Sequence, residues 1–177
     1  LSMEHKQFDY IVIGGGSAGC VLAGRLSEDP NISVCLLEAG GGGDSWTVNV
    51  PCAAVVSIPT KINNWAFETV PQKGLNGRKG YQPRGKGLGG SSAINAMIYI
   101  RGNAQDYDHW AALGNQGWSY DEVLPYFIKS ENNERIHDQY HGNAGPLSVT
   151  DLRSDNPLQQ RYLTAAREQG FPIRDDF

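Results

Sequence analysis

The chain has 177 residues, enough for a domain with a hydrophobic core, and its formal net charge of −4 offers no basic surface to a nucleic acid. Hydrophobic residues make up 40% and charged residues 19%, which is typical of a globular protein and excludes a disordered one. Glycine is over-represented, with 22 residues gathered mainly at 14–19, 40–43 and 85–90. Such clusters indicate sharp turns or close approach of the backbone to a ligand.

The first elements in chain order form a strand–helix–strand unit. Tyr10–Ile13 is a short apolar run typical of a buried parallel strand, and Val34–Leu37 is a second such run. Between them, residues 17–26 carry apolar side chains at helical spacing. A strand, a helix and a strand within about 30 residues predict a βαβ unit with a right-handed crossover.

The remaining elements are less regular. Residues 44–90 show no clear periodicity, which favours a long segment wrapped around a ligand. A helix is expected over 103–113, and a capping-box pattern at Ser119 predicts the start of another, limited or kinked by a proline. A strand is expected over 146–150 and a helix over 156–170.

The cysteines and the N-terminal region exclude several classes of protein. Cys20, Cys35 and Cys52 lack the spacing of a metal or redox motif, so we expect buried structural thiols without metal or disulfide. The apolar run near the N-terminus is too short for a signal peptide or a transmembrane segment. We therefore expect a cytoplasmic protein, with peripheral attachment to the inner membrane left open.

A glycine motif lies between the first strand and the first helix. Gly14 to Gly19 read GxGxxG, in which the glycines allow a tight turn, the approach of a pyrophosphate, and close helix packing. Glu38 ends the second strand, 19 residues after Gly19, where a carboxylate can bind ribose hydroxyls. The pattern predicts a dinucleotide site. The acidic residue disfavours NADP but does not separate NAD from FAD.

A second glycine-rich segment runs from Gly85 to Asn95. It has little side-chain bulk and many backbone donors, so it suits a flat ring or a phosphate, and it lacks the residue order of a P-loop. A flexible surface loop is the alternative interpretation of its composition.

This second segment resembles the first signature of the glucose–methanol–choline (GMC) oxidoreductase family. The matching residues are Gly85, Lys86, Leu88, Gly89, Gly90, Ser91, Ser92, Ile94, Asn95, Tyr99, Gly102 and Asp108. Further matches to the family lie at 9–14, 37–40, 64–67, 117–118, 124–127, 141–142 and 145–146. The similarity is greatest to the bacterial branch of choline-dehydrogenase-like and aliphatic alcohol dehydrogenases.

The resemblance implies an α/β fold, in which a Rossmann-type FAD-binding βαβ unit precedes the beginning of an α+β substrate-binding domain. It implies a tail at 1–7, the first part of the FAD-binding domain at 8–102, and connecting helices with the start of the substrate-binding domain at 103–177. The fold is then incomplete without later sequence. FAD is expected to be non-covalent, because Ile94 stands where some members carry a flavin-linked histidine.

The resemblance also implies which residues hold FAD. The residues expected at the pyrophosphate are Gly14, Gly16, Ser17, Ala18 and Gly19. Glu38 is expected to bind the ribose with Ala39 beside it, and Trp65 to border the nucleotide. The residues expected to approach the isoalloxazine, largely through backbone atoms, are Leu88, Gly90, Ser91, Asn95, Ala96, Met97 and Ile98.

The implied reaction is oxidation of a small-molecule alcohol to an aldehyde by hydride transfer to flavin N5, with oxygen or a quinone-type compound as acceptor. The catalytic histidine of the family lies near the C-terminus of its much longer members. No histidine here matches it, so we expect no catalytic residue and an inactive N-terminal third. His141 is expected in a structural turn. Exposed surface positions are expected for His5, His109 and His137.

Three other functions remain open at this point. A flavin-containing hydroxynitrile lyase shares the fold, and a non-catalytic nucleotide-binding module would share the first motif. An NAD-dependent Rossmann enzyme is the third, but a plain NAD domain does not need the segment at 85–108.

Overall fold

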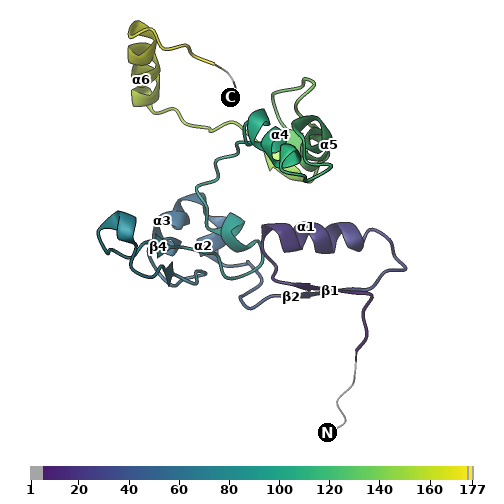
Figure 1. Cartoon of the computed structure of the whole chain (residues 1–177). Coiled ribbons are helices and arrows are strands. Elements are labelled where there is room, and N and C mark those ends of the chain that lie inside the picture. The colour runs from purple at the N-terminus through teal and green to yellow at the C-terminus, as the bar shows by residue number, and fades with distance from the viewer. Residues whose placement is uncertain (1–5, 175, 177) are drawn as a thin grey trace. The chain divides into compact units, whose positions relative to one another are not determined.

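A computed structural model describes residues 6–174 and residue 176. The chain forms two compact units, Leu1–Ile98 and Tyr99–Phe177 (Figure 1). Both units combine helices with short strands, which confirms the expected α/β class. Most of the tail expected at 1–7 lies outside the described residues.

The first unit opens with the expected βαβ arrangement. Strand β1 (Tyr10–Ile13), helix α1 (Ser17–Leu26) and strand β2 (Val34–Leu37) have the bounds that the sequence predicts. The two strands pair in parallel, with Tyr10 opposite Val34 and Ile13 opposite Leu37. Helix α1 runs along the strands and contacts both of them (Figure 1). The turn after β1 is thereby fixed at the start of α1.

The expectation that β1 is buried is wrong for this chain. Ile11 is 59% exposed and Ile13 is 85% exposed. Successive strand residues point to opposite faces, and Val12 points toward α1, where its Cγ1 would lie 3.4 Å from a Cβ built on Gly19. The helix therefore covers one face of the two-stranded sheet, while the isoleucines occupy the other face.

The segment at 44–90 is more structured than its sequence suggests. It contains the short helices α2 (Trp46–Asn49) and α3 (Ala54–Ser57), and the 3-10 turns η1 (Pro51–Ala53) and η2 (Lys73–Leu75); η3 (Gly90–Ala93) follows. Strands β3 (Phe67–Glu68) and β4 (Tyr81–Gln82) pair antiparallel. Elements of four residues or fewer are too short to show a hydrophobic period.

Asn64 holds this segment together from a buried position. Its Nδ2 lies 2.9–3.2 Å from three carbonyl oxygens of the turn at 57–60. Its Oδ1 accepts hydrogen bonds at 2.9 Å from the N–H groups of Ala66 and Arg84. One side chain therefore joins the end of α3 to both strands of the hairpin region.

In the second unit, the described residues form three helices and a two-stranded parallel sheet. The helices are α4 (Ala104–Ala112), α5 (Tyr120–Ser130) and α6 (Pro157–Glu168), and the strands are β5 (Glu131–Asn133) and β6 (Leu147–Val149). The helices and β6 agree with expectation within two residues, whereas β5 was not expected. Capping boxes begin α4 at Asn103 and α5 at Ser119. Pro125 lies inside α5 and does not end it.

Aromatic rings join α4 to α5. The ring of Tyr107 lies 5.4 Å from that of Trp110, 6.2 Å from that of Tyr120 and 5.7 Å from that of Phe127. Two of these contacts are edge-to-face, an arrangement in which the positive edge of one ring meets the negative face of another. The two helices are therefore held by ring packing.

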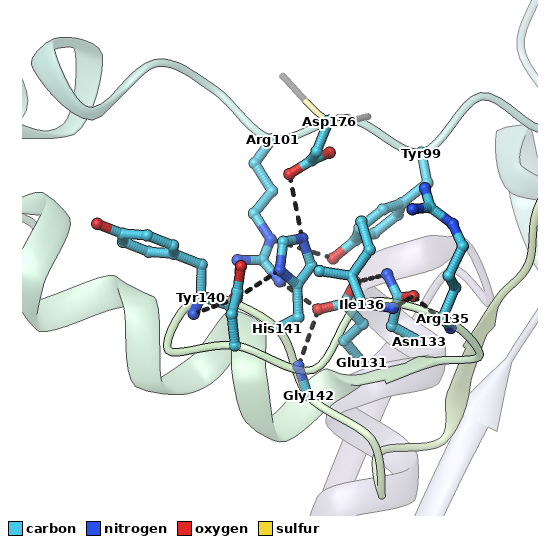
Figure 2. Close-up of polar contacts among 11 residues, drawn as sticks. Tyr99, Arg101, Glu131, Asn133, Arg135, Ile136, Tyr140, His141, Gly142 and Asp176 are labelled. Carbon is cyan, nitrogen blue, oxygen red and sulfur yellow. Dashed lines mark hydrogen bonds and ion pairs between the residues drawn. The ribbon is translucent and has the colours of Figure 1, made fainter. Parts of the chain in front are cut away.

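A buried ion pair is formed by Arg101 and Glu131 (Figure 2), and the guanidinium carbon of Arg101 lies 5.2 Å from the centre of the Phe127 ring. The side chain of Glu131 is fully buried and pairs with Arg101, which also donates to the carbonyl oxygen of Tyr140. The Glu131 carboxylate accepts further hydrogen bonds from Asn133 Nδ2 at 3.1 Å and from the Gly142 N–H at 3.0 Å. The pair thus ties the segment before α4 to β5 and to the loop at 140–142.

We predict that Arg101→Met lowers the free energy of unfolding by about 3–5 kcal/mol, because it leaves a buried carboxylate without a counter-charge. The control is Arg25→Met, which removes an exposed ion pair with Glu28 and should cost about 1 kcal/mol or less. Urea denaturation followed by tryptophan fluorescence measures both.

Adding Glu131→Gln to Arg101→Met should recover part of the loss, because the uncompensated charge is removed. Equal stabilities of the Arg101→Met and Arg25→Met variants would contradict the structural role of the pair.

Candidate functional site

The turn between β1 and α1 leaves the start of the helix accessible. A Cβ on Gly19 would lie 1.9 Å from the carbonyl oxygen of Gly14, so only glycine lets the helix pack this closely on the turn. A Cβ on Gly16 would meet nothing within 4 Å. Gly16 supplies no capping side chain, and the first turn of α1 holds no acidic residue. The positive end of the helix therefore carries neither a side-chain cap nor an acidic residue, as an anionic ligand there requires.

The carboxylate of Glu38 lies at the centre of three glycine segments. Its Oε2 accepts a hydrogen bond from the N–H of Gly15 at 2.7 Å. Its Oε1 accepts from the N–H of Gly40 at 2.8 Å and from that of Gly87 at 3.0 Å. The N–H of Ala39 also contributes to the lowered pKa of Glu38. Glu38 therefore orders the loops through backbone donors on both of its oxygens.

Backbone donors set the charge state of Glu38. Hydrogen bonds from the N–H of Gly40, and then from that of Gly15, hold the pKa of Glu38 below its usual value. These donors favour the charged form because a protonated carboxyl accepts more weakly. Glu38 is consequently an anion at neutral pH.

The second glycine segment packs directly on the first. The N–H of Gly89 donates to the carbonyl oxygen of Gly15 at 2.8 Å, and the hydroxyls of Ser17 and Ser92 lie 2.5 Å apart. Gly90 has a φ of +53°, and a Cβ there would lie 2.7 Å from the Cα of Gly16. Two independent features therefore require glycine at 90, and the segment is anchored to the first glycine loop by hydrogen bonds.

The structure places the other expected residues around this core. Trp65 lies beside the second segment, with Lys86 Nζ 4.4 Å from the centre of its ring and Phe67 stacked on it at 5.8 Å. Ala39 is exposed next to Glu38. The segment from Asn95 to Ile98 follows η3 and is also exposed. The first glycine loop, Glu38 and residues 88–91 are thus brought together, whereas 95–98 extends beyond them.

Sequence reasoning missed the residues that bond to Glu38. Gly15, Gly40 and Gly87 all use backbone N–H groups. A backbone contact leaves no side-chain pattern, so the only available signal was the clustering of glycine at these places. That clustering marks the segments and not the individual donors.

The cysteines differ in part from expectation. Cys20 and Cys35 are half-buried, but Cys52 is exposed, so the expectation of a buried thiol is wrong for Cys52. Cys52 lies in the three-residue 3-10 turn η1, which buries Ala53 and leaves the side chain of Cys52 at the surface. All three thiols are free.

The histidines divide into exposed and packed groups. His109 and His137 are exposed as expected, and His5 lies outside the described residues. The side chain of His141 is only 10% exposed, with Nδ1 2.7 Å from Asp138 and Nε2 3.4 Å from Asp176 (Figure 2). The hydrogen bond from His141 is the main reason that the pKa of Asp138 is lowered. The imidazole of His141 thus lies between the carboxylates of Asp138 and Asp176, and its contact with Asp138 stabilises the turn that contains both residues.

Residues 6–174 and 176 contain no cluster of His, Cys, Asp or Glu side chains that could hold a metal ion. Over the same residues, every helix is too short or too polar to cross a membrane.

Comparison with known proteins identifies the family. Residues 8–177 match the family model of the N-terminal GMC oxidoreductase domain. The chain belongs to the GMC oxidoreductase family. The expected resemblance is therefore confirmed, and the glycine segments described above lie in its N-terminal domain.

Individual relatives match over nearly the whole chain. It is 49% identical over 177 residues to an oxygen-dependent choline dehydrogenase from Chromohalobacter salexigens, covering 98% of this chain and 32% of the relative. It is 46% identical over 171 residues to an alcohol dehydrogenase [acceptor] from Pseudomonas putida, covering 96% and 31%. The structure of an FAD-dependent oxidoreductase from Chaetomium thermophilum matches with a TM-score of 0.82 at 33% identity, covering 96% and 31%. The chain thus spans about a third of the length of these relatives.

We predict that the contribution of Glu38 to stability depends on pH. Because its pKa in the folded state is lowered, the contribution is complete above the pKa of the unfolded chain and is lost as the pH falls through the lower folded value. Glu38→Gln, which replaces an acceptor oxygen with a donor, should lower the thermal unfolding midpoint at pH 7. The difference from the unsubstituted protein should shrink in acid.

The matched control is Glu68→Gln, which removes an exposed carboxylate 3.7 Å from Lys79 and should have a small effect at both pH values. A Glu38→Gln difference of the same size at pH 7 and in acid would contradict the assignment.

Proposed function

We propose that this chain forms the FAD-holding part of an enzyme that oxidises an alcohol to an aldehyde. The observation that carries the proposal is the position of Glu38, whose carboxylate gathers three glycine segments beside the open start of α1. This arrangement combines an anion site with a hydroxyl acceptor, as a ribose linked to a pyrophosphate requires. The membership of the GMC oxidoreductase family supports FAD over NAD.

The proposed contacts follow the expectation from sequence. The pyrophosphate would lie on Gly14, Gly16, Ser17, Ala18 and Gly19. The ribose would bind Glu38, with Ala39 beside it and Trp65 at the border of the nucleotide. The isoalloxazine would lie against Leu88, Gly90, Ser91, Asn95, Ala96, Met97 and Ile98.

The residues at 90–94 favour non-covalent FAD. Ile94 has no nucleophilic atom and is 5% exposed, so its side chain is part of the packing of the unit. Held in this way, FAD would accept the hydride of the alcohol carbon. The protein residues described here bind and orient the cofactor, and none of them is assigned to removal of the hydroxyl proton.

The length of the relatives limits what these residues can do. The chain spans 31–32% of the length of the relatives named above. We therefore propose that turnover needs residues from the remaining length, and that the 177 residues alone are inactive. Purified alone, they should give no alcohol-dependent dye reduction above a blank. A yellow monomer that reduces dye with alcohol would overturn this proposal.

The reaction class has its own test in a complete enzyme that carries this sequence. Anaerobic addition of a primary alcohol or choline should bleach the visible absorbance of the flavin, because the two electrons of the substrate pass to it. A flavin that stays oxidised, while a hydroxynitrile is cleaved, would support the lyase of the same fold in place of the oxidoreductase.

The packing of the glycine segments gives a prediction for cofactor binding. Gly90→Ala should raise the dissociation constant for FAD at least tenfold, because the added Cβ would lie 2.7 Å from the Cα of Gly16 and force the segments apart. Gly24→Ala is the matched control: a Cβ on this exposed glycine of α1 meets nothing within 4 Å. It should leave FAD binding unchanged and stabilise the helix by about 1 kcal/mol. Flavin fluorescence quenching measures both constants, and equal values for the two variants would contradict the site.

A further inference from the structure

Two asparagines in the first unit build the same local turn. The Oδ1 of Asn64 accepts a hydrogen bond from the N–H of Ala66 at 2.9 Å, and Ala66 has a φ of +51°. The Oδ1 of Asn95 accepts from the N–H of Met97 at 2.8 Å, and Met97 has a φ of +60°. A residue with a side chain is strained in this left-handed region. In each turn, the asparagine holds the strained residue in place.

The two turns differ in what surrounds them. Asn64 is buried and bonds to several other groups, so its turn is fixed by the packing of the unit. Asn95 is exposed, and within the described residues its side chain forms a hydrogen bond only with Met97. Met97 is 67% exposed and Ile98 is 77% exposed. Packing therefore fixes the first strained turn, whereas within the described residues Asn95 alone holds the second.

The second turn presents backbone donors and apolar side chains together. The N–H of Met97 is bonded to Asn95, whereas those of Ala96 and Ile98 have no acceptor within the described part of the chain. An exposed surface of this kind is complementary to a flat ring that carries carbonyl and nitrogen acceptors on its edge. Backbone strain kept at an exposed place is typical of a ligand-binding segment.

We propose that Asn95 is a positioning residue, which holds Met97 in the left-handed conformation so that the backbone at 96–98 meets the edge of the isoalloxazine. The inference rests on the proposed function, because the ring is that of the proposed cofactor. Asn95 acts through the peptide of Met97 and needs no contact of its own with the ring. Glycine at 97 would adopt the same conformation without help from a side chain.

The test uses a complete flavoenzyme that carries this sequence, with two measurements: the dissociation constant for FAD and the visible circular dichroism of the bound flavin. Asn95→Ala should raise the dissociation constant about tenfold, because the turn relaxes before binding, and should change the dichroism spectrum. Adding Met97→Gly to Asn95→Ala should restore both values. The unfolding midpoint of the FAD-free protein should change little in either variant.

Asn76→Ala is the matched control, since Asn76 is exposed in the same unit and has a φ of +54° at the end of η2. It should leave both flavin measurements unchanged. Three results would overturn the inference: unchanged binding and dichroism in Asn95→Ala, no recovery on adding Met97→Gly, or an effect of Asn76→Ala as large as that of Asn95→Ala. An unsubstituted enzyme that binds no FAD would instead remove the proposed function itself.

Discussion

The first unit depends on one carboxylate that organises segments without side chains. Gly15, Gly40 and Gly87 cannot fix one another by side-chain packing, yet their N–H groups all point at Glu38. Hydrogen bonds to an ionised acceptor are about twice as strong as those between neutral groups. One charged side chain therefore orders three segments that are distant in sequence.

Close backbone approach is the second constraint, and it explains the glycine content better than flexibility does. Gly19 rests on the carbonyl of Gly14, and Gly90 rests on the Cα of Gly16. In each contact, backbone packs directly on backbone because there is no side chain between them. This packing holds the loops in place, and no side chain projects from the glycine positions. A pyrophosphate can approach such a surface closely. The glycines that make the cradle rigid are thus the same ones that would admit the cofactor.

The sequence predicted the elements that carry a local pattern of apolar residues or capping groups, and it failed for an element fixed by polar contacts. The βαβ unit and the capped starts of α4 and α5 were predictable because strand runs and capping boxes are local patterns. Strand β5 was not, because its sequence Glu-Asn-Asn is polar and is held by an ion pair with Arg101, thirty residues away. The exposure of Ile13 could not be predicted either, since it depends on what covers the sheet.

In both units a carboxylate accepts hydrogen bonds from several turns. The two carboxylates differ in burial and in whether a cation neutralises them. Glu131 is fully buried, is neutralised by Arg101, and bonds to Asn133 and Gly142, so its environment is closed. Glu38 is half-buried and has no cationic partner within the described residues. Backbone N–H groups stabilise its charge instead. A carboxylate that is ordered but not neutralised is suited to bind a hydroxyl donor, which supports the proposed binding role of Glu38 and a structural role for Glu131.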